Sequence, residues 1–171
     1  MKRCLPVLTV VFAVLLIITG CSGAAPKVQP KTDGFSCQAA IHYRELELVA
    51  QLTRQGNGEL ETTFSLPKSL SGITLGWDGT DMTMTLGGVT MTLPTEKVPE
   101  SALIRCLLDV LAAQHTGGTQ TEEGYVINGE VQGKAYVLVC DPDTGLPKSL
   151  SVPEEELSAV FTAMEILPKT E

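Results

Sequence analysis

The sequence predicts a mainly β domain, in which one antiparallel sheet carries one main helix. Two observations support this fold class. Apolar and polar residues alternate along much of the chain after residue 35, and glycine-containing turn signals separate the alternating runs. One stretch around residue 105 instead has the three-to-four spacing of an amphipathic helix. Residues 35–169 have the size of a single domain with one core.

The first half of the domain has a period of two, which is typical of strands with one buried and one wet face. We expect strands at Phe35–Tyr43, Leu46–Arg54, Glu59–Leu66, Ile73–Trp77, Met82–Leu86 and Val89–Leu93. Tight turns are predicted at Gly56–Gly58, Asp78-Gly79 and Gly87-Gly88, because these residues favour hairpin connections. These short turns predict that the six strands form a meander, in which each strand pairs antiparallel with the next.

The helix is predicted from Pro99 to Ala113. Proline is favoured in the first turn of a helix, and an acidic residue such as Glu100 suits the positive end of the helix dipole. The apolar stripe consists of Leu103, Ile104, Leu107, Val110 and Leu111. We expect this stripe to pack on the sheet and the helix to stop before Gly117-Gly118.

Strands are predicted to resume at Tyr125–Val131, Lys134–Asp141 and Leu146–Val152. The last segment, Leu157–Leu167, has two interpretations. Its acidic start at Glu154–Glu156 and its apolar spacing slightly favour a short helix. Alternation of Leu157, Ala159, Phe161 and Ala163 would equally suit an edge strand.

The N-terminus has the pattern of a secretory signal. Lys2 and Arg3 precede an apolar run from Leu5 to Ile18, which is shorter than the roughly 20 residues that a spanning helix needs. The run ends in Ile18-Thr19-Gly20-Cys21, which resembles the lipobox of bacterial lipoproteins. The alternatives are a plain signal peptide with a cysteine nearby and an uncleaved anchor.

The lipobox resemblance implies that the thiol of Cys21 receives a diacylglyceryl group and that the chain is cut before it. It divides the chain into a signal peptide (1–20), a flexible tether (21–34) and the β domain (35–169). Two or three acyl chains hold a protein firmly, since each buried methylene contributes about 0.8 kcal/mol. We therefore expect a lipid anchor on the extracytoplasmic face of the cell membrane, with no cofactor besides the covalent acyl groups.

Charge and cysteine content exclude several classes of protein. The formal net charge of −8 argues against nucleic-acid binding, which needs basic patches. Cys37, Cys106 and Cys140 remain in the domain, and the sequence leaves open whether one pair forms a disulfide or all three are buried thiols. Their spacing does not fit a metal site, and His42 and His115 are the only histidines.

The sequence offers no convincing catalytic motif. Ser65 and Lys68 have Ser-x-x-Lys spacing, but Pro67 places them at a strand end rather than at the start of a helix. Asp141 and Asp143 lack the remaining ligands of a calcium loop. We therefore expect a protein that is not an enzyme and that holds no metal.

Several short motifs resemble the LolA-like lipoprotein family. They are Leu66-Pro67 with Leu70-Ser71-Gly72-Ile73, Val139-Cys140-Asp141 with Thr144-Gly145-Leu146-Pro147, and Val160-Phe161. This resemblance implies a curved, incomplete antiparallel barrel with the main helix packed on its concave face. It also favours a strand at Leu157–Leu167 and implies that the concave apolar side binds acyl chains or a lipid-bearing partner.

Candidate ligand-binding residues on this concave side are apolar and alternate along three strands: Trp77, Met82, Met84, Leu86, Met91 and Leu93. The alternative is that they only form the core under the helix. Two functions remain open: a binding module for a lipid or other apolar group, and an accessory subunit that recruits or activates an envelope (cell-wall) protein. A protein anchored at Cys21 cannot act as a soluble shuttle.

Overall fold

The computed structural model describes residues 28–168. The predicted signal peptide, Cys21 and the tether up to residue 27 lie outside these described residues. Within residues 28–168, no helix is long and apolar enough to cross a membrane.

The described chain forms an antiparallel meander interrupted by a helix. Its first strands are β1 (Phe35–Tyr43), β2 (Leu46–Arg54), β3 (Leu60–Leu66), β4 (Thr74–Trp77), β5 (Asp81–Leu86) and β6 (Val89–Pro94). The short 3₁₀ helix η1 (Thr95–Lys97) and the helix α2 (Leu103–Ala112) follow. The second half contains β7 (Thr119–Gln120), β8 (Tyr125–Val131), β9 (Lys134–Cys140), β10 (Pro147–Val152), η2 (Pro153–Glu155) and β11 (Leu157–Ile166).

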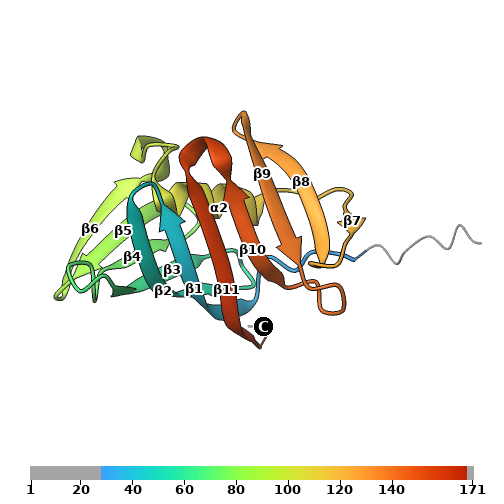
Figure 1. Cartoon of the computed structure of the whole chain (residues 1–171). Helices are drawn as coiled ribbons and strands as arrows, with labels where there is room; N and C mark the ends of the chain where they lie inside the picture. Colours follow the sequence, from blue (N-terminus) through green and yellow to red (C-terminus); the bar gives the residue numbers. More distant parts are fainter. Residues whose placement is uncertain (1–27, 169–171) are drawn as a thin grey trace, which may run out of the picture.

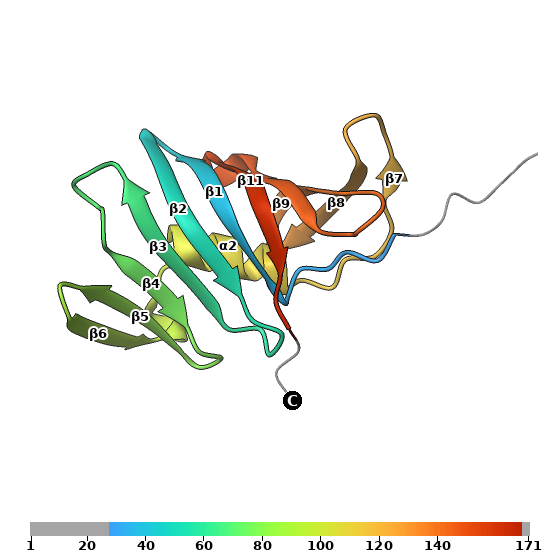
Figure 2. The same cartoon turned by 90° about the horizontal axis from the view of Figure 1, so that it is seen from below.

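All strands belong to one 11-stranded sheet with the order β6-β5-β4-β3-β2-β1-β11-β10-β9-β8-β7. The first and last strands pair with each other at the centre, and every pairing is antiparallel. The sheet curls around α2, which crosses its strands inside the curve (Figures 1 and 2). The predicted fold class, a curved antiparallel sheet with the main helix on its concave face, is therefore confirmed.

The core lies between α2 and the concave face of the sheet. Seven helix residues are buried: Leu103, Ile104, Cys106, Leu107, Leu108, Val110 and Leu111. Opposite them, β1 buries alternate residues, Phe35, Cys37, Ala39 and Ile41. Each large apolar side chain that leaves water contributes about 1.5–3 kcal/mol, so this contact dominates the stability of the domain.

The helix begins later than predicted, at Leu103 rather than at Pro99. Residues 99–102 form a turn instead, closed by a bond from the amide of Ala102 to the carbonyl of Pro99. The carbonyl of Glu100 in this turn accepts hydrogen bonds from the side chains of Lys134 and Cys106, both at 3.3 Å. Tertiary contacts thus replace the first helical turn that the sequence favours locally.

The last segment is a strand, as the family resemblance implied, and not the helix that its local pattern slightly favoured. It is also no edge strand, because β11 lies between β1 and β10. Leu157, Ala159 and Phe161 face the core at 5% exposure or less. Burial on the concave face outweighs the helical tendency of the local sequence.

The cysteines of the domain are buried thiols. Cys37, Cys106 and Cys140 are free in the described chain. Burial raises the pKa of Cys37 to about 12. Burial, with a smaller contribution from Asp141, raises the pKa of Cys140 to about 11. These groups stay protonated near neutral pH and pack as small apolar side chains.

Candidate functional site

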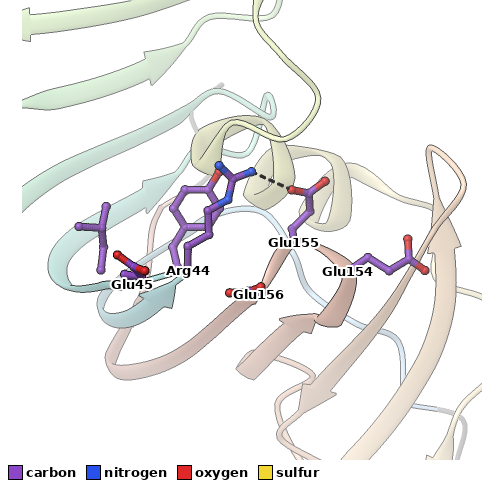
Figure 3. A pocket seen from close by; sticks show the side chains of 7 residues that line it. Arg44, Glu45, Glu154, Glu155 and Glu156 are labelled. Atoms are coloured by element: carbon purple, nitrogen blue, oxygen red, sulfur yellow. Dashed lines mark hydrogen bonds and ion pairs between the residues drawn. The ribbon is translucent and has the colours of Figure 1, made fainter.

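One candidate site is a cleft of about 650 Å³ between the β1–β2 turn and the loop around η2. Figure 3 shows Arg44 and Glu45 from the turn opposite Glu154, Glu155 and Glu156. The turn and the loop are joined by the amide of Arg44, which donates to the carbonyl of Glu156 at 2.9 Å. The cleft is thus a fixed hollow with a predominantly acidic wall.

Glu155 is the centre of the ion pairs beside this cleft. Its carboxylate lies 2.7 Å from the Nζ of Lys134 on β9 and 3.4 Å from Nη2 of Arg44. The hydrogen bond from Lys134 holds the pKa of Glu155 below its ordinary value, and it raises the pKa of Lys134. Lys134 also donates to the carbonyl of Glu100, which precedes α2.

These contacts give the carboxylate of Glu155 a structural role. Here the half-buried carboxylate of Glu155 is already neutralised by two cations, and Glu154 and Glu156 are exposed. The pairs therefore clamp β9, the β1–β2 turn and the entry to α2 together.

Ser65 of the Ser-x-x-Lys match and Asp141 of the calcium-like turn both bond to the backbone. Ser65 lies near the end of β3, and its Oγ donates to the carbonyl of Val49 at 3.0 Å. Asp141 accepts bonds from the backbone amides of Asp143 and Thr144 at 3.1 and 2.9 Å. These bonds close the β9–β10 turn, so the Asp141 carboxylate shapes the backbone.

The apolar residues proposed as a binding site share one face of the sheet. Register pairs Trp77 with Met82 and, further along, Met84 with Met91. Leu93 lies opposite Met82, and Leu86 lies opposite Val89. All of them continue the inward face that carries the core residues Leu60 and Phe64 of β3, as the alternation predicted.

Of these six residues, only Met82 and Trp77 are covered by the rest of the domain. Met82 is 5% exposed and belongs to the core, and Trp77 packs against that core while donating from Nε1 to Thr95 Oγ1 at 3.1 Å. The remaining residues are open to solvent: Met84 40%, Leu86 52%, Met91 56% and Leu93 47% exposed. Of the six candidates, these four lie on an open surface rather than around an enclosed cavity.

Sequence reasoning omitted two members of this region. Val89 extends the same face and is 69% exposed, and its place in the Val-Thr-Met-Thr-Leu alternation would have found it. We call Met84, Leu86, Val89, Met91 and Leu93 the open apolar face. Arg54, the second omission, lies 4% exposed at the end of β2, with its guanidinium carbon 5.8 Å from the Trp77 ring centroid.

Arg54 is unusual because its Nε and Nη1 have no hydrogen-bond partner within residues 28–168. Burial lowers the pKa of its guanidinium, and the charge of Asp33 raises it by less. Its register partner Leu60 lies beside Trp77 in the sheet. A buried cation therefore marks the boundary between the covered core and the open apolar face.

No protein-family model matches the chain, and no curated protein matches it either. Solved structures do resemble it. An uncharacterized conserved protein from Thermus thermophilus superposes with a TM-score of 0.50 at 16% identity, over 82% of this chain and 83% of that one. This likeness is one of fold.

Two further structures are similar at lower TM-scores. The LolA superfamily protein NE2245 from Nitrosomonas europaea gives a TM-score of 0.43 at 11% identity, over 86% of this chain and 91% of that one. The structure of the CwlD amidase from Clostridioides difficile in complex with the GerS lipoprotein gives 0.44 at 15% identity, over 95% of this chain and 94% of that one.

Proposed function

We propose that this chain is a lipid-anchored, non-enzymatic binding subunit of the cell envelope, and that its open apolar face docks an apolar part of an envelope protein. The observation that carries this proposal is the exposure of Met84, Leu86, Met91 and Leu93, between 40% and 56%, on a sheet whose inner residues on β1 are buried under α2. Large contiguous apolar patches are uncommon on monomers and mark interaction sites.

The shape of the surface favours a protein over a lipid. Helix α2 already fills the concave face opposite β1, so an acyl chain would lie on β5 and β6 with one side still in water. A folded partner can cover such a face completely and exclude water from its centre, as protein interfaces do. The flexible side chains of Met84 and Met91 can adapt to the partner.

The second candidate function is binding of a lipid on the same face. The cross-strand pair Met84 and Met91 supports it, because two adaptable thioether side chains suit an apolar chain of variable length. Trp77 is the only tryptophan of the protein, so its fluorescence reports this region alone.

The decisive experiment is a chemical crosslinking pull-down of the full chain from native membranes. We expect the double variant Met84→Gln/Leu86→Gln to lose the crosslinked envelope partner. The matched control Thr85→Gln/Thr92→Gln changes the opposite face of the same hairpin and should retain it. Equal recovery with both variants would contradict docking on the open apolar face.

The lipid alternative is tested separately with vesicles that contain brominated acyl chains. Quenching of Trp77 fluorescence that disappears in Met84→Gln/Leu86→Gln would favour lipid binding over a protein partner. The anchor itself is tested by Cys21→Ala, which should move the protein from the membrane to the soluble fraction and abolish the mass increase of lipidation. Unchanged fractionation and mass would refute the anchor.

A further inference from the structure

Strands β5 and β6 carry almost the same five residues. Residues 82–86 read Met-Thr-Met-Thr-Leu, and residues 89–93 read Val-Thr-Met-Thr-Leu. In the hairpin they pair antiparallel, with Met84 opposite Met91, and Thr83 and Thr85 opposite Thr92 and Thr90. Each threonine thus faces a threonine, and Thr85 and Thr90 share a hydroxyl hydrogen bond of 2.8 Å.

In the sheet that residues 28–168 form, β6 is an end strand and its outer side has no neighbouring strand (Figure 1). All six of its residues are exposed, and none of them is charged. Folded proteins usually block such edges with lysine, with bulges or with very short strands. The opposite edge follows that rule, since β7 has only two residues.

The turn fixes which backbone groups of β6 face outward. Gly87 and Gly88 form a two-residue hairpin turn with φ of 58° and 83°, so Leu86 and Val89 are a hydrogen-bonded pair. Such pairs alternate with non-hydrogen-bonded ones along the ladder. The amides and carbonyls of Thr90 and Thr92 therefore point away from β5, towards the open edge.

We propose that β6 pairs with β6 of a second copy of this chain, antiparallel and centred on Met91. In that register Thr90 of one copy faces Thr92 of the other, and each such pair exchanges two backbone hydrogen bonds. Met91 faces Met91, and Val89 faces Leu93. At Val89, Thr90, Met91 and Thr92 the second copy thus offers the same residue type that β5 offers from the other side of β6, and only Leu93 differs, with Val89 in place of Met82.

Charge and geometry agree with this occupant. The chain is acidic overall, with a formal charge of −8, yet β6 brings no like charges together. Pro94 has no amide hydrogen and limits the pairing to the uncharged segment. The backbone bonds use the strand edge, and of the open apolar face only the β6 residues Val89, Met91 and Leu93 meet the second copy. Met84 and Leu86 on β5 stay free, so the dimer does not depend on the proposed function.

Cysteine crosslinking of the full chain in its native membranes tests the register. Met91→Cys lies on the two-fold axis, where the facing Cβ atoms come within about 5 Å and can form a disulfide. Val89→Cys is the control: its residue is 69% exposed, but in this dimer two copies of it lie about 13 Å apart along the strand. We expect an oxidised dimer with Met91→Cys and not with Val89→Cys.

Mixing Val89→Cys with Leu93→Cys should restore the crosslink, because these positions face each other. The buried native thiols at Cys37, Cys106 and Cys140 contribute little, and the unsubstituted chain is oxidised in parallel to measure that background. Equal crosslinking of Met91→Cys and Val89→Cys would overturn the proposal, as would a Met91→Cys chain that remains monomeric.

A second variant separates pairing from collision. Thr90→Pro removes an amide that faces the open edge and leaves the backbone bonds to β5 intact, whereas Thr90→Val keeps that amide. Both variants lose the hydroxyl bond between Thr90 and Thr85, so this loss cancels in the comparison. Sedimentation of the full chain in detergent should give monomers for Thr90→Pro and dimers for Thr90→Val. The same mass for both variants would refute the pairing, and Met84→Gln/Leu86→Gln should leave the dimer unchanged.

Discussion

The hairpins β8–β9 and β5–β6 stand near the two ends of one sheet and have the same alternation of apolar residues. On β8–β9 the inward residues Tyr125, Ile127, Tyr136, Leu138 and Cys140 are all buried, at 6% exposure or less. On β5–β6 the inward residues beyond Met82 are 40% to 69% exposed. Alternation therefore tells which side chains share a face, but it does not tell whether anything covers that face.

The length of α2 explains this difference. Its ten residues span about 15 Å at 1.5 Å per residue. Neighbouring strands lie about 4.8 Å apart, so the helix backbone crosses the width of roughly three strands, and its side chains reach somewhat further. One helix cannot cover an 11-stranded sheet, and the uncovered part falls on β5 and β6.

The largest expected change in stability comes from a buried residue of β8–β9, and it is compared with an exposed residue of β5–β6. Leu138→Ala on β9 removes a side chain that is 0% exposed, and we expect it to lower the free energy of unfolding by about 3 kcal/mol. The matched change Met91→Ala on β6, where the side chain is 56% exposed, should cost less than about 1 kcal/mol. Urea unfolding measures both, and equal losses would show that the open apolar face is covered in solution.

A smaller loss of stability is expected when the ion pairs near β9 are removed. Within residues 28–168 the ion pairs found include none on β4–β6. Glu155→Gln weakens the bonds to Lys134 and Arg44, and we expect it to cost about 1–2 kcal/mol at neutral pH, since hydrogen bonds to charged groups are worth more than neutral ones. Glu154→Gln, in the same cleft but exposed, is the control.

The pH dependence of Glu155→Gln follows from the direction of the pKa shift. Because Lys134 lowers the pKa of Glu155, the pair stabilises the fold above the ordinary pKa of glutamate. This stabilisation is lost as the pH falls through the lowered pKa of the folded state. The variant should therefore lose less stability on acidification than the unsubstituted chain, and parallel melting curves against pH would contradict this.

The smallest effect concerns the boundary between the two regions. Arg54→Met removes a buried cation whose Nε and Nη1 have no partner in the described chain, at the cost of its contact with the Trp77 ring. An unpaired buried donor costs about 1–3 kcal/mol and the ring contact returns about 1 kcal/mol, so stability should rise by up to about 2 kcal/mol. A clear loss in urea unfolding would reveal an uncounted partner of the guanidinium.

Much of the fold could be predicted because it depends on local patterns. Alternation placed the long strands within one or two residues, and the family resemblance placed β11. The start of α2 could not be predicted, because it depends on where Lys134 and Cys106 meet the carbonyl of Glu100. The local helix signals at Pro99 do not predict such tertiary contacts.

The candidate site was predictable in composition but not in coverage. Trp77, Met84 and Met91 do share a face, as period two requires. Whether that face encloses a ligand depends on the length and path of α2 across the sheet. The burial of Arg54 was equally hidden, because a charged residue at the end of a strand usually lies in water.

Residues 29–31 enter the domain at the β9–β10 turn, where the amide of Lys31 donates to the carbonyl of Gly145 at 2.8 Å. This entry point lies towards the β7 end of the sheet, far from β6 (Figure 2). The anchor that we propose at Cys21 would therefore be attached at the β7 end of the sheet. β6 and Met91, at the opposite end, would be the part of the domain that the attachment constrains least.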